Sequence, residues 1–186
     1  MPFQLSKYSL PQNETLLSAC RNQLRMWLGI LSDTHDELAR TQRALEILQA
    51  NGAETLVHCG DLSSPPVLIA CSVLPCYFVF GNHDADEVPV LLKTAAKIGA
   101  YCLGWGGVIE VAGKRVGIAH GHMTADVRRV LASAPDYLLS GHSHEKSDEV
   151  RNGVRRINPG ALYRADEFTV ALLEIETGEL RFLLVD

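Results

Sequence analysis

The sequence predicts an α/β fold in which two packed β-sheets carry helices on their outer faces. Between residues 26 and 104, short apolar runs alternate with stretches of helical spacing, which is typical of βαβ units with buried parallel strands. After residue 104 the chain favours strands, with hairpin turns expected at Ala112-Gly113 and Thr177-Gly178. Alternating elements followed by mostly strands indicate two sheets.

The elements follow from local patterns in chain order. Leu38, Leu45 and Leu48 lie near helical spacing before Asn51-Gly52, and Pro65 is suited to the first turn of a helix. The expected helices are residues 37–50, a short segment from 65, 88–98 and 124–132. The expected strands are residues 27–31, 55–57, 76–80, 106–111, 114–119, 137–139, 155–158, 168–175 and 180–185.

Length and charge limit the organisation of the chain. With 186 residues, against about 150 per domain, the sequence predicts one domain. Residues 1–25 are polar and irregular, with a short amphipathic helix expected after Asn13, so we divide the chain into an N-terminal extension (1–25) and a domain (26–186). Its 17 basic residues are scattered among 22 acidic ones, giving −5, which argues against tight nucleic-acid binding.

Apolar runs and cysteines predict the compartment. No run reaches the 18 apolar residues of a membrane span, and residues 1–25 lack the apolar core of a signal peptide, so we expect a cytoplasmic protein without a membrane partner. The five cysteines are an odd number without a CxxC pair, which fits reduced thiols.

The histidines gather at the ends of predicted strands. All seven lie between residues 35 and 144, and six come just after a predicted strand. Because ligands of open α/β sheets collect at the carboxyl ends of strands, these side chains are expected on one rim of the fold. The polar segments are Ser32-Asp33-Thr34-His35, Gly60-Asp61, Gly81-Asn82-His83-Asp84, His120-Gly121-His122 and Gly141-His142-Ser143-His144.

These segments, D-x-H, G-D, G-N-H-D, H-G-H and G-H-x-H in this order, resemble the calcineurin-like metallophosphoesterase superfamily. The resemblance runs from Met26 to about Arg164, and the later Asn158-Pro159-Gly160 is similar to the small YfcE-type phosphodiesterases. It implies a four-layer αββα sandwich with two mixed β-sheets flanked by helices. It also implies a phosphoesterase acting on small phosphodiesters or phosphomonoesters.

The resemblance assigns metal ligands residue by residue. One divalent metal would be held by Asp33, His35, Asp61 and His144, with Asp61 bridging to a second metal held with Asn82, His120 and His142. Two divalent cations, two carboxylates and a bridging hydroxide leave about +1, which suits an anionic phosphate ester. Manganese is our first expectation for both ions, while the N/O ligands also suit Fe, Zn, Ni or Mg.

Four further residues are expected to act on the substrate. The resemblance implies that His83 protonates the leaving alkoxide, and Asp84 is placed to orient its ring. His122 is expected to touch substrate or support a ligand, and Arg164 to meet a substrate phosphate or to lie solvated at the surface. His58 matches no ligand position, so we interpret it as structural or as supporting a ligand.

Two other functions stay open at this point. A retromer subunit of the same superfamily has the same fold and serves as a non-catalytic binding scaffold, although every ligand position and His83 are present here. A nuclease of the superfamily would be expected to have a longer chain and a basic groove. Homo-oligomer formation is also left open.

Overall fold

The computed structural model describes residues 26–186, so the expected extension 1–25 and its short helix lie outside the described residues. The strands are β1 (Trp27–Leu31), β2 (Thr55–His58), β3 (Cys76–Phe78), β4 (Tyr101–Cys102), β5 (Gly106–Val111), β6 (Lys114–Ala119), β7 (Tyr137–Leu139), β8 (Ser147–Arg151), β9 (Val154–Asn158), β10 (Thr169–Glu174) and β11 (Leu180–Leu184). The helices are α2 (Leu38–Ala50), α3 (Pro65–Cys71), the 3₁₀ helix η1 (Asn82–Glu87), α4 (Val88–Ile98) and α5 (Thr124–Leu131).

The strands form two mixed sheets, as expected. The first has the order β11-β10-β1-β2-β3-β4, and the second has the order β5-β6-β7-β9-β8. In the first sheet β1, β2, β3 and β4 run parallel, whereas β10 pairs antiparallel with β1. In the second sheet β6, β7 and β9 run parallel. The carboxyl ends of β1, β2, β3, β6 and β7 are the ends that carry the predicted site.

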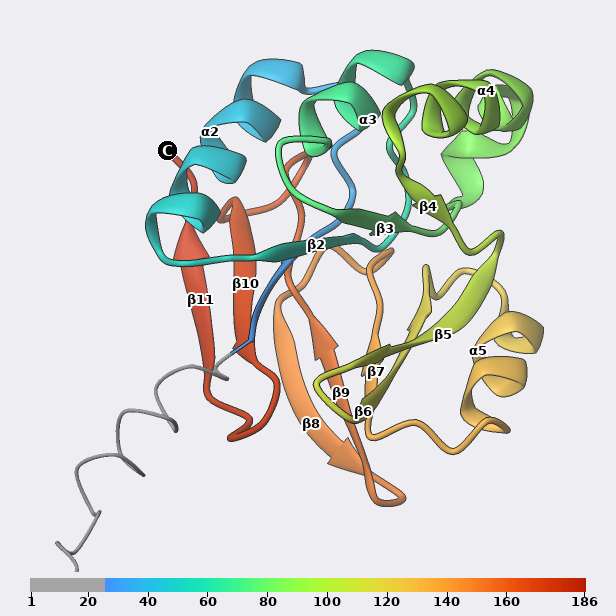
Figure 1. The fold of residues 1–186 in the computed structure, drawn as a ribbon, viewed down its shortest axis with the longest axis vertical. Coiled ribbons are helices and arrows are strands. Elements are labelled where there is room, and N and C mark those ends of the chain that lie inside the picture. Colours follow the sequence, from blue (N-terminus) through green and yellow to red (C-terminus); the bar gives the residue numbers. More distant parts are fainter. Residues whose placement is uncertain (1–25) are drawn as a thin grey trace, which may run out of the picture.

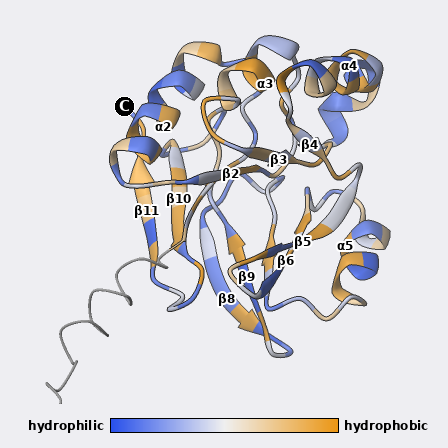
Figure 2. Ribbon diagram, viewed as in Figure 1, coloured by the Kyte–Doolittle hydropathy of each residue, from blue (hydrophilic) through white to orange (hydrophobic). Residues whose placement is uncertain are grey.

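The four layers follow from alternation along the strands. In β1, Leu28 and Ile30 face the core between the sheets, whereas Leu31 faces α2 on the outer side. Helices α2, α3 and α4 cover the first sheet and α5 covers the second (Figure 1). The helices of both outer layers carry hydrophilic as well as hydrophobic residues, whereas β10 and β11 are mainly hydrophobic (Figure 2). The expected αββα sandwich is therefore confirmed.

Three elements escaped the sequence prediction. The edge strand β8 is exposed at all five residues, so it has no alternation of apolar and polar side chains to mark it. Strand β4 has only two residues, and η1 runs directly into α4 without a break. Strand β3 ends at Phe78, two residues before its expected end, because Val79 and Phe80 already belong to the loop that leads to the site.

Within residues 26–186, no helix combines the length and the apolar character needed to cross a membrane.

Candidate metal centre

The segments after β1, β2, β3, β7 and β9 line one cavity at the carboxyl ends of these strands. The cavity has a volume of about 540 Å³ and includes seven of the sequence-predicted site residues. Its lining residues are His35, Asp61, Ser63, Asn82, His83, His142, His144, Tyr163 and Arg164. Residues that are more than 100 positions apart in the chain thus share one space.

Backbone hydrogen bonds join the first two loops. The N–H of Asp33 donates to the carbonyl oxygen of Gly60 at 3.0 Å, and the N–H groups of Thr34 and His35 both donate to that of Asp61 at 3.1 and 3.0 Å. Because β1 and β2 run parallel and adjacent, their loops leave the sheet side by side and continue the ladder beyond the strands. These backbone hydrogen bonds between the two loops fix the two predicted carboxylate ligands relative to each other.

Five of the seven predicted ligands have left-handed backbone conformations. Their φ angles range from 42° at His35 to 71° at His142, and the residues are Asp33, His35, Asp61, His142 and His144. Such a conformation costs about 1–3 kcal/mol for a residue with a side chain and tends to cluster at functional sites. The loops therefore turn sharply at the residues whose side chains enter the cavity.

The two predicted carboxylate ligands, Asp33 and Asp61, each have one oxygen that accepts a backbone hydrogen bond and one that faces imidazole rings. The N–H of His142 donates to Oδ2 of Asp33 at 3.0 Å, and the N–H of His83 donates to Oδ1 of Asp61 at 2.8 Å. The remaining oxygen of Asp33 lies 3.3 Å from Nε2 of His144, and that of Asp61 lies 3.4 Å from Nε2 of His35 and from Nε2 of His120. The oxygens that face the rings are thus fixed in position.

Two of the imidazoles are oriented from behind by backbone carbonyls. Nδ1 of His120 donates to the carbonyl oxygen of Cys59 at 2.8 Å, and Nδ1 of His144 donates to that of Arg164 at 3.3 Å. Since the carbonyls only accept, Nδ1 carries the proton in both rings, and Nε2 is directed at the carboxylates. Histidines that bind metals are usually held in this way.

Close backbone approach at two glycines makes room for the carboxylates. A Cβ on Gly81 would lie 2.1 Å from Oδ1 of Asp61, and a Cβ on Gly141 would lie 2.6 Å from Oδ2 of Asp33. Any side chain at these positions would displace the carboxylate, so both motifs require glycine for packing.

The charges of the site are strongly coupled. Burial by itself raises the pKa of Asp61, but hydrogen bonds from His120 and from the His83 backbone, with the charge of His120, bring that pKa down to about 2. Burial lowers the pKa of His120, yet the hydrogen bond to Asp61 and the negative charges of Asp33 and Asp61 raise it overall. For His35, burial outweighs the same carboxylates and lowers the pKa. An ionised carboxylate at Asp61 is the state that binds cations.

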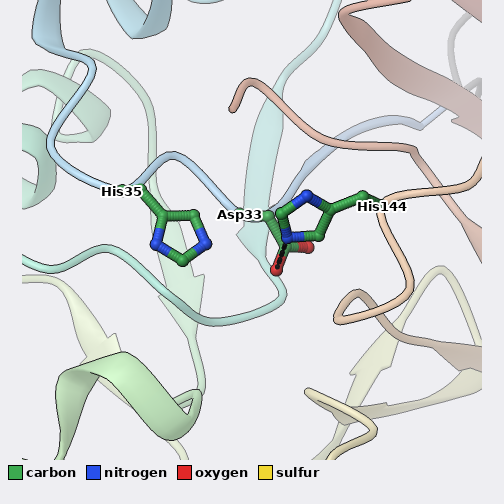
Figure 3. A group of neighbouring side chains, drawn as sticks. All are labelled: Asp33, His35 and His144. Carbon is green, nitrogen blue, oxygen red and sulfur yellow. Dashed lines mark ion pairs between the residues drawn. The ribbon is translucent and has the colours of Figure 1, made fainter. Parts of the chain in front are cut away.

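The donor set fits divalent metal ions. Three groups have ligand atoms within 4.8 Å of one another, and they are Asp33–His35–His144, His35–Asp61–His83 and Asp33–Asp61–His120. Figure 3 shows the first group, with the rings of His35 and His144 entering from different loops and the His144–Asp33 pair dashed. Oδ1 of Asp33 and Nε2 of His35 are buried without a hydrogen-bond partner among the described residues. Coordination of a metal ion would account for both of these polar atoms.

Asn82 and His142 lie beside these groups. The Oδ1 atom of Asn82 is 3.2 Å from Nε2 of His120, and the His142 ring is centred 5.2 Å from that of His120. Both side chains are exposed and line the cavity. The Asn82 side-chain oxygen thus contacts the Nε2 atom of His120, whereas the contact between His142 and His120 is one between their rings.

His83 and Asp84 are adjacent in the chain but differ in environment. The exposed His83 ring lies edge-on to that of His35, with the centroids 4.8 Å apart. We expected Asp84 to orient this ring, but its carboxylate is fully buried and accepts backbone N–H groups from Asp61 at 2.9 Å, Ser63 at 2.7 Å and Gly81 at 2.8 Å. The hydrogen bonds of Asp84 therefore join two loops of the site. Burial raises its pKa despite these bonds.

The two predicted substrate contacts lie on opposite sides of the site. Arg164 lines the cavity, and its guanidinium carbon is 4.9 Å from the centre of the Tyr163 ring. His122 contacts the rings of His120 and Trp105 at 5.3 and 5.8 Å, on the side of the site that is formed by β6. His122 does not contribute to the lining of the cavity itself.

Sequence reasoning missed Tyr163 as a residue of the site. Its ring lies 4.8 Å from that of His35 and 4.9 Å from the guanidinium carbon of Arg164, so it links a predicted ligand to a predicted substrate contact. The signal that would have suggested it is its position three residues after Gly160, within the segment that follows Asn158-Pro159-Gly160. Aromatic residues alone were too few to draw attention to it.

Residues 26–178 match the family model of the calcineurin-like phosphoesterase superfamily domain. A phosphodiesterase of Methanocaldococcus jannaschii is 29% identical over 171 residues, which cover 87% of this chain and 100% of that protein. The phosphodiesterase YfcE of Escherichia coli K12 is 26% identical over 152 residues, covering 74% of this chain and 79% of YfcE.

Solved structures have the same architecture. An archaeal phosphodiesterase superposes with a TM-score of 0.76 and 30% identity, covering 86% of this chain and 100% of that one. A Vps29 mutant from Entamoeba histolytica superposes with a TM-score of 0.60 at 18% identity, covering 87% and 100%, which establishes only a shared fold.

Proposed function

The chain belongs to the calcineurin-like phosphoesterase superfamily, and from this premise we propose that it hydrolyses small phosphodiesters or phosphomonoesters with two divalent metal ions. The observation that carries the proposal is the pairing of the Asp33 and Asp61 carboxylates with imidazole Nε2 atoms. Asp33 and Asp61 each present one oxygen to rings whose other nitrogen, in His120 and His144, is held by a backbone carbonyl. This is the arrangement expected of metal ligands.

The ligands divide between two ions. Asp33, His35 and His144 form one compact group, and Asp61 faces both His35 and His120, which supports Asp61 as the bridging ligand. Asn82, His120 and His142 would complete the second site with Asp61. Two bound divalent cations would supply an activated water and charge stabilisation for the phosphoryl oxygens. We propose manganese first, with Fe, Zn, Ni or Mg as alternatives.

The residues around the ligands supply the remaining functions. His83 is exposed at the cavity beside His35 and would donate a proton to the leaving alkoxide oxygen. The guanidinium of Arg164, set against Tyr163 at the cavity wall, would bind a phosphate oxygen of the substrate. His122 would support His120 through its ring contact. We propose that Asp84 positions the loops of Asp61 and Gly81 for this chemistry.

The size and chemistry of the cavity support a small substrate. Its volume of about 540 Å³ lies within the range of small-molecule sites. Two of the similar proteins, from Methanocaldococcus jannaschii and Escherichia coli K12, are named phosphodiesterases, and we therefore place diesters before monoesters. The family match begins at Met26, which supports treating 26–186 as the catalytic domain. A cytoplasmic location and homo-oligomer formation remain proposals.

The second candidate function is a non-catalytic scaffold. The shared fold with Vps29 keeps this candidate in view. The presence of all seven predicted ligands and His83 favours the enzyme, because a scaffold has no need of a buried Asp33 oxygen that lacks a hydrogen-bond partner among the described residues.

Hydrolysis of bis-para-nitrophenyl phosphate tests the proposal. Protein purified without added ions is analysed for bound metal and is then assayed with each candidate ion. We expect activity with Mn²⁺ and its loss in both the Asp61→Ala and the His142→Ala variants. Undiminished hydrolysis by both variants would reject the site, and metal binding without any hydrolysis would favour the scaffold.

A further inference from the structure

His58 is a fully buried histidine at the end of β2 that the proposed mechanism does not use. Its Nδ1 accepts a hydrogen bond from the backbone N–H of Gly60 at 3.2 Å, and its Nε2 lies 3.1 Å from Oγ1 of Thr34. Because an N–H only donates, Nδ1 is the unprotonated nitrogen of the neutral ring. Nε2 then donates to Thr34, whose hydroxyl lies 3.2 Å from the carbonyl oxygen of Asp61.

The peptide bound by His58 also orients a predicted ligand. The N–H of Gly60 and the C=O of Cys59 belong to one peptide group, and that carbonyl accepts the Nδ1–H of His120 at 2.8 Å. The peptide is trans, so its N–H and C=O point in opposite directions. His58 and His120 therefore form hydrogen bonds to opposite edges of the same rigid peptide group.

This peptide lacks restraint from its own side chain. Gly60 has a φ of 102°, and a Cβ there would lie 2.8 Å from both the Gly81 nitrogen and Nδ1 of His120. The position therefore requires glycine, whose backbone rotates more freely than that of any other residue. The hydrogen bond to His58 supplies the restraint that a side chain would otherwise give.

We propose that His58 is a positioning residue, which fixes the Cys59–Gly60 peptide so that the Cys59 carbonyl holds the ring of His120 toward Asp61. The proposal rests on the proposed function insofar as it treats His120 as a metal ligand. It requires only an acceptor at the place of Nδ1. A residue that fills the same space without that acceptor would release the peptide and, with it, the orientation of His120.

Two amide substitutions distinguish the loss of the Nδ1 hydrogen-bond acceptor from a simple change in side-chain volume at position 58. In His58→Asn the amide oxygen is attached to Cγ, as Nδ1 is, and can accept the Gly60 N–H. In His58→Gln the amide group is one bond farther out, near the place of Nε2, where it can reach Thr34 but not Gly60. Both variants place a polar, neutral side chain in the same buried position.

The first measurement is proton exchange of the His120 Nδ1–H by NMR in the metal-free protein. We expect this proton to be protected in the wild type and in His58→Asn and to exchange rapidly in His58→Gln. The second is the affinity for Mn²⁺ by calorimetry, which should fall about 10- to 100-fold in His58→Gln and stay within about threefold in His58→Asn.

The outcomes are distinguishable from those of the proposed function. If His58→Gln keeps the protected proton, or if both variants lose it equally, His58 only fills space and the proposal is overturned. If His58→Gln loses the exchange protection of the His120 Nδ1–H without any change in Mn²⁺ affinity, the proposal is also overturned, since metal binding would then not depend on the positioning of His120. A wild-type protein that binds Mn²⁺ but hydrolyses nothing would refute the proposed function and leave the role of His58 supported or refuted by these two measurements.

Discussion

The backbone N–H of His83 donates a 2.8 Å hydrogen bond to Oδ1 of Asp61, which joins the loop of the proposed general acid to the proposed bridging carboxylate. Oδ2 of the same carboxylate faces His35 and His120, each at 3.4 Å. One side chain therefore sets the relative position of three loops. Changes at Asp61 should affect metal binding first, because the oxygen that faces these two imidazoles is the one that would bind the metal ions.

We predict that Asp61→Asn keeps the fold and loses metal. The amide oxygen can still accept the His83 N–H, but the negative charge that binds cations is gone. We expect at least one fewer ion per chain by metal analysis and a fall in kcat/KM of about 100-fold or more. Glu46→Gln, at an exposed carboxylate of α2 that pairs with Arg43, serves as the matched control and should change neither. Full metal content in Asp61→Asn would contradict the bridging assignment.

We predict that the cost of His83→Ala depends on the leaving group. A general acid contributes about 10²- to 10⁴-fold when the leaving oxygen is a poor leaving group. An alkyl phosphodiester should therefore lose at least about 100-fold in kcat, whereas a para-nitrophenyl ester, whose leaving oxygen needs no proton, should lose far less. The ratio of the two rates measures this effect. Equal losses for both esters would show that His83 acts by binding alone.

We predict that Asp84→Asn destabilises the protein through its loops. The carboxylate accepts three backbone N–H groups, and an amide in its place turns its NH₂ toward at least one of them. Leaving a buried donor unpaired costs about 1–3 kcal/mol. Urea unfolding of the metal-free protein would measure this loss. Asp86→Asn, at an exposed residue of the same 3₁₀ helix, should leave the free energy of unfolding unchanged.

We predict that His58 makes the metal-free protein acid-sensitive. Burial is the largest cause that lowers the pKa of His58 to about 3, and the positive charge of His120 adds to it. Below about pH 6.5 the imidazole of His58 becomes protonated in the unfolded chain but stays neutral in the folded protein. The contribution of His58 to the free energy of unfolding is therefore intact above that pH and is lost as pH falls from 6.5 toward 3. Between these limits the free energy of unfolding should fall by about 1.4 kcal/mol per pH unit more in the wild type than in His58→Asn. Parallel curves for the two proteins would refute a neutral, buried His58.

Burial explains why strands such as β1 and β2 were predicted and the edge strand β8 was missed, whereas β4 is too short and η1 too continuous with α4 to be recognised. Strands such as β1 and β2 are buried on both faces, so their apolar runs are visible in the sequence. Strand β8 is exposed throughout, and its pairing with β9 depends on backbone hydrogen bonds that leave no pattern in the side chains. Burial leaves a signal in the sequence, whereas pairing at an exposed edge does not.

The same distinction applies to the site. The position of the histidines after strands predicted one shared rim, and the family resemblance implied the seven ligands. The structure brings five of them into compact groups, which are Asp33, His35, Asp61, His120 and His144. Several contacts of Asp84 and Tyr163 were not predicted, because they depend on how loops far apart in the chain pack together, as Asp84 does with Asp61 and Tyr163 with His35. For Asp84 the partners are backbone N–H groups, which every residue has and no motif can mark.

We predict that Gly141→Ala damages metal binding more than its effect on stability would suggest. A Cβ at this position would lie 1.9 Å from Oγ of Ser32 and 2.6 Å from Oδ2 of Asp33, so the Asp33 carboxylate must move away from its place beside His144. Overpacking of this kind costs about 1–3 kcal/mol. Gly113→Ala is the matched control, since a Cβ there meets nothing within 4 Å and the φ of 75° costs about 1–2 kcal/mol by itself. Both variants should unfold at lower urea concentrations than the wild type, but only Gly141→Ala should bind Mn²⁺ more weakly in calorimetry. Equal Mn²⁺ affinity in the two variants would mean that the position of Asp33 does not determine metal binding.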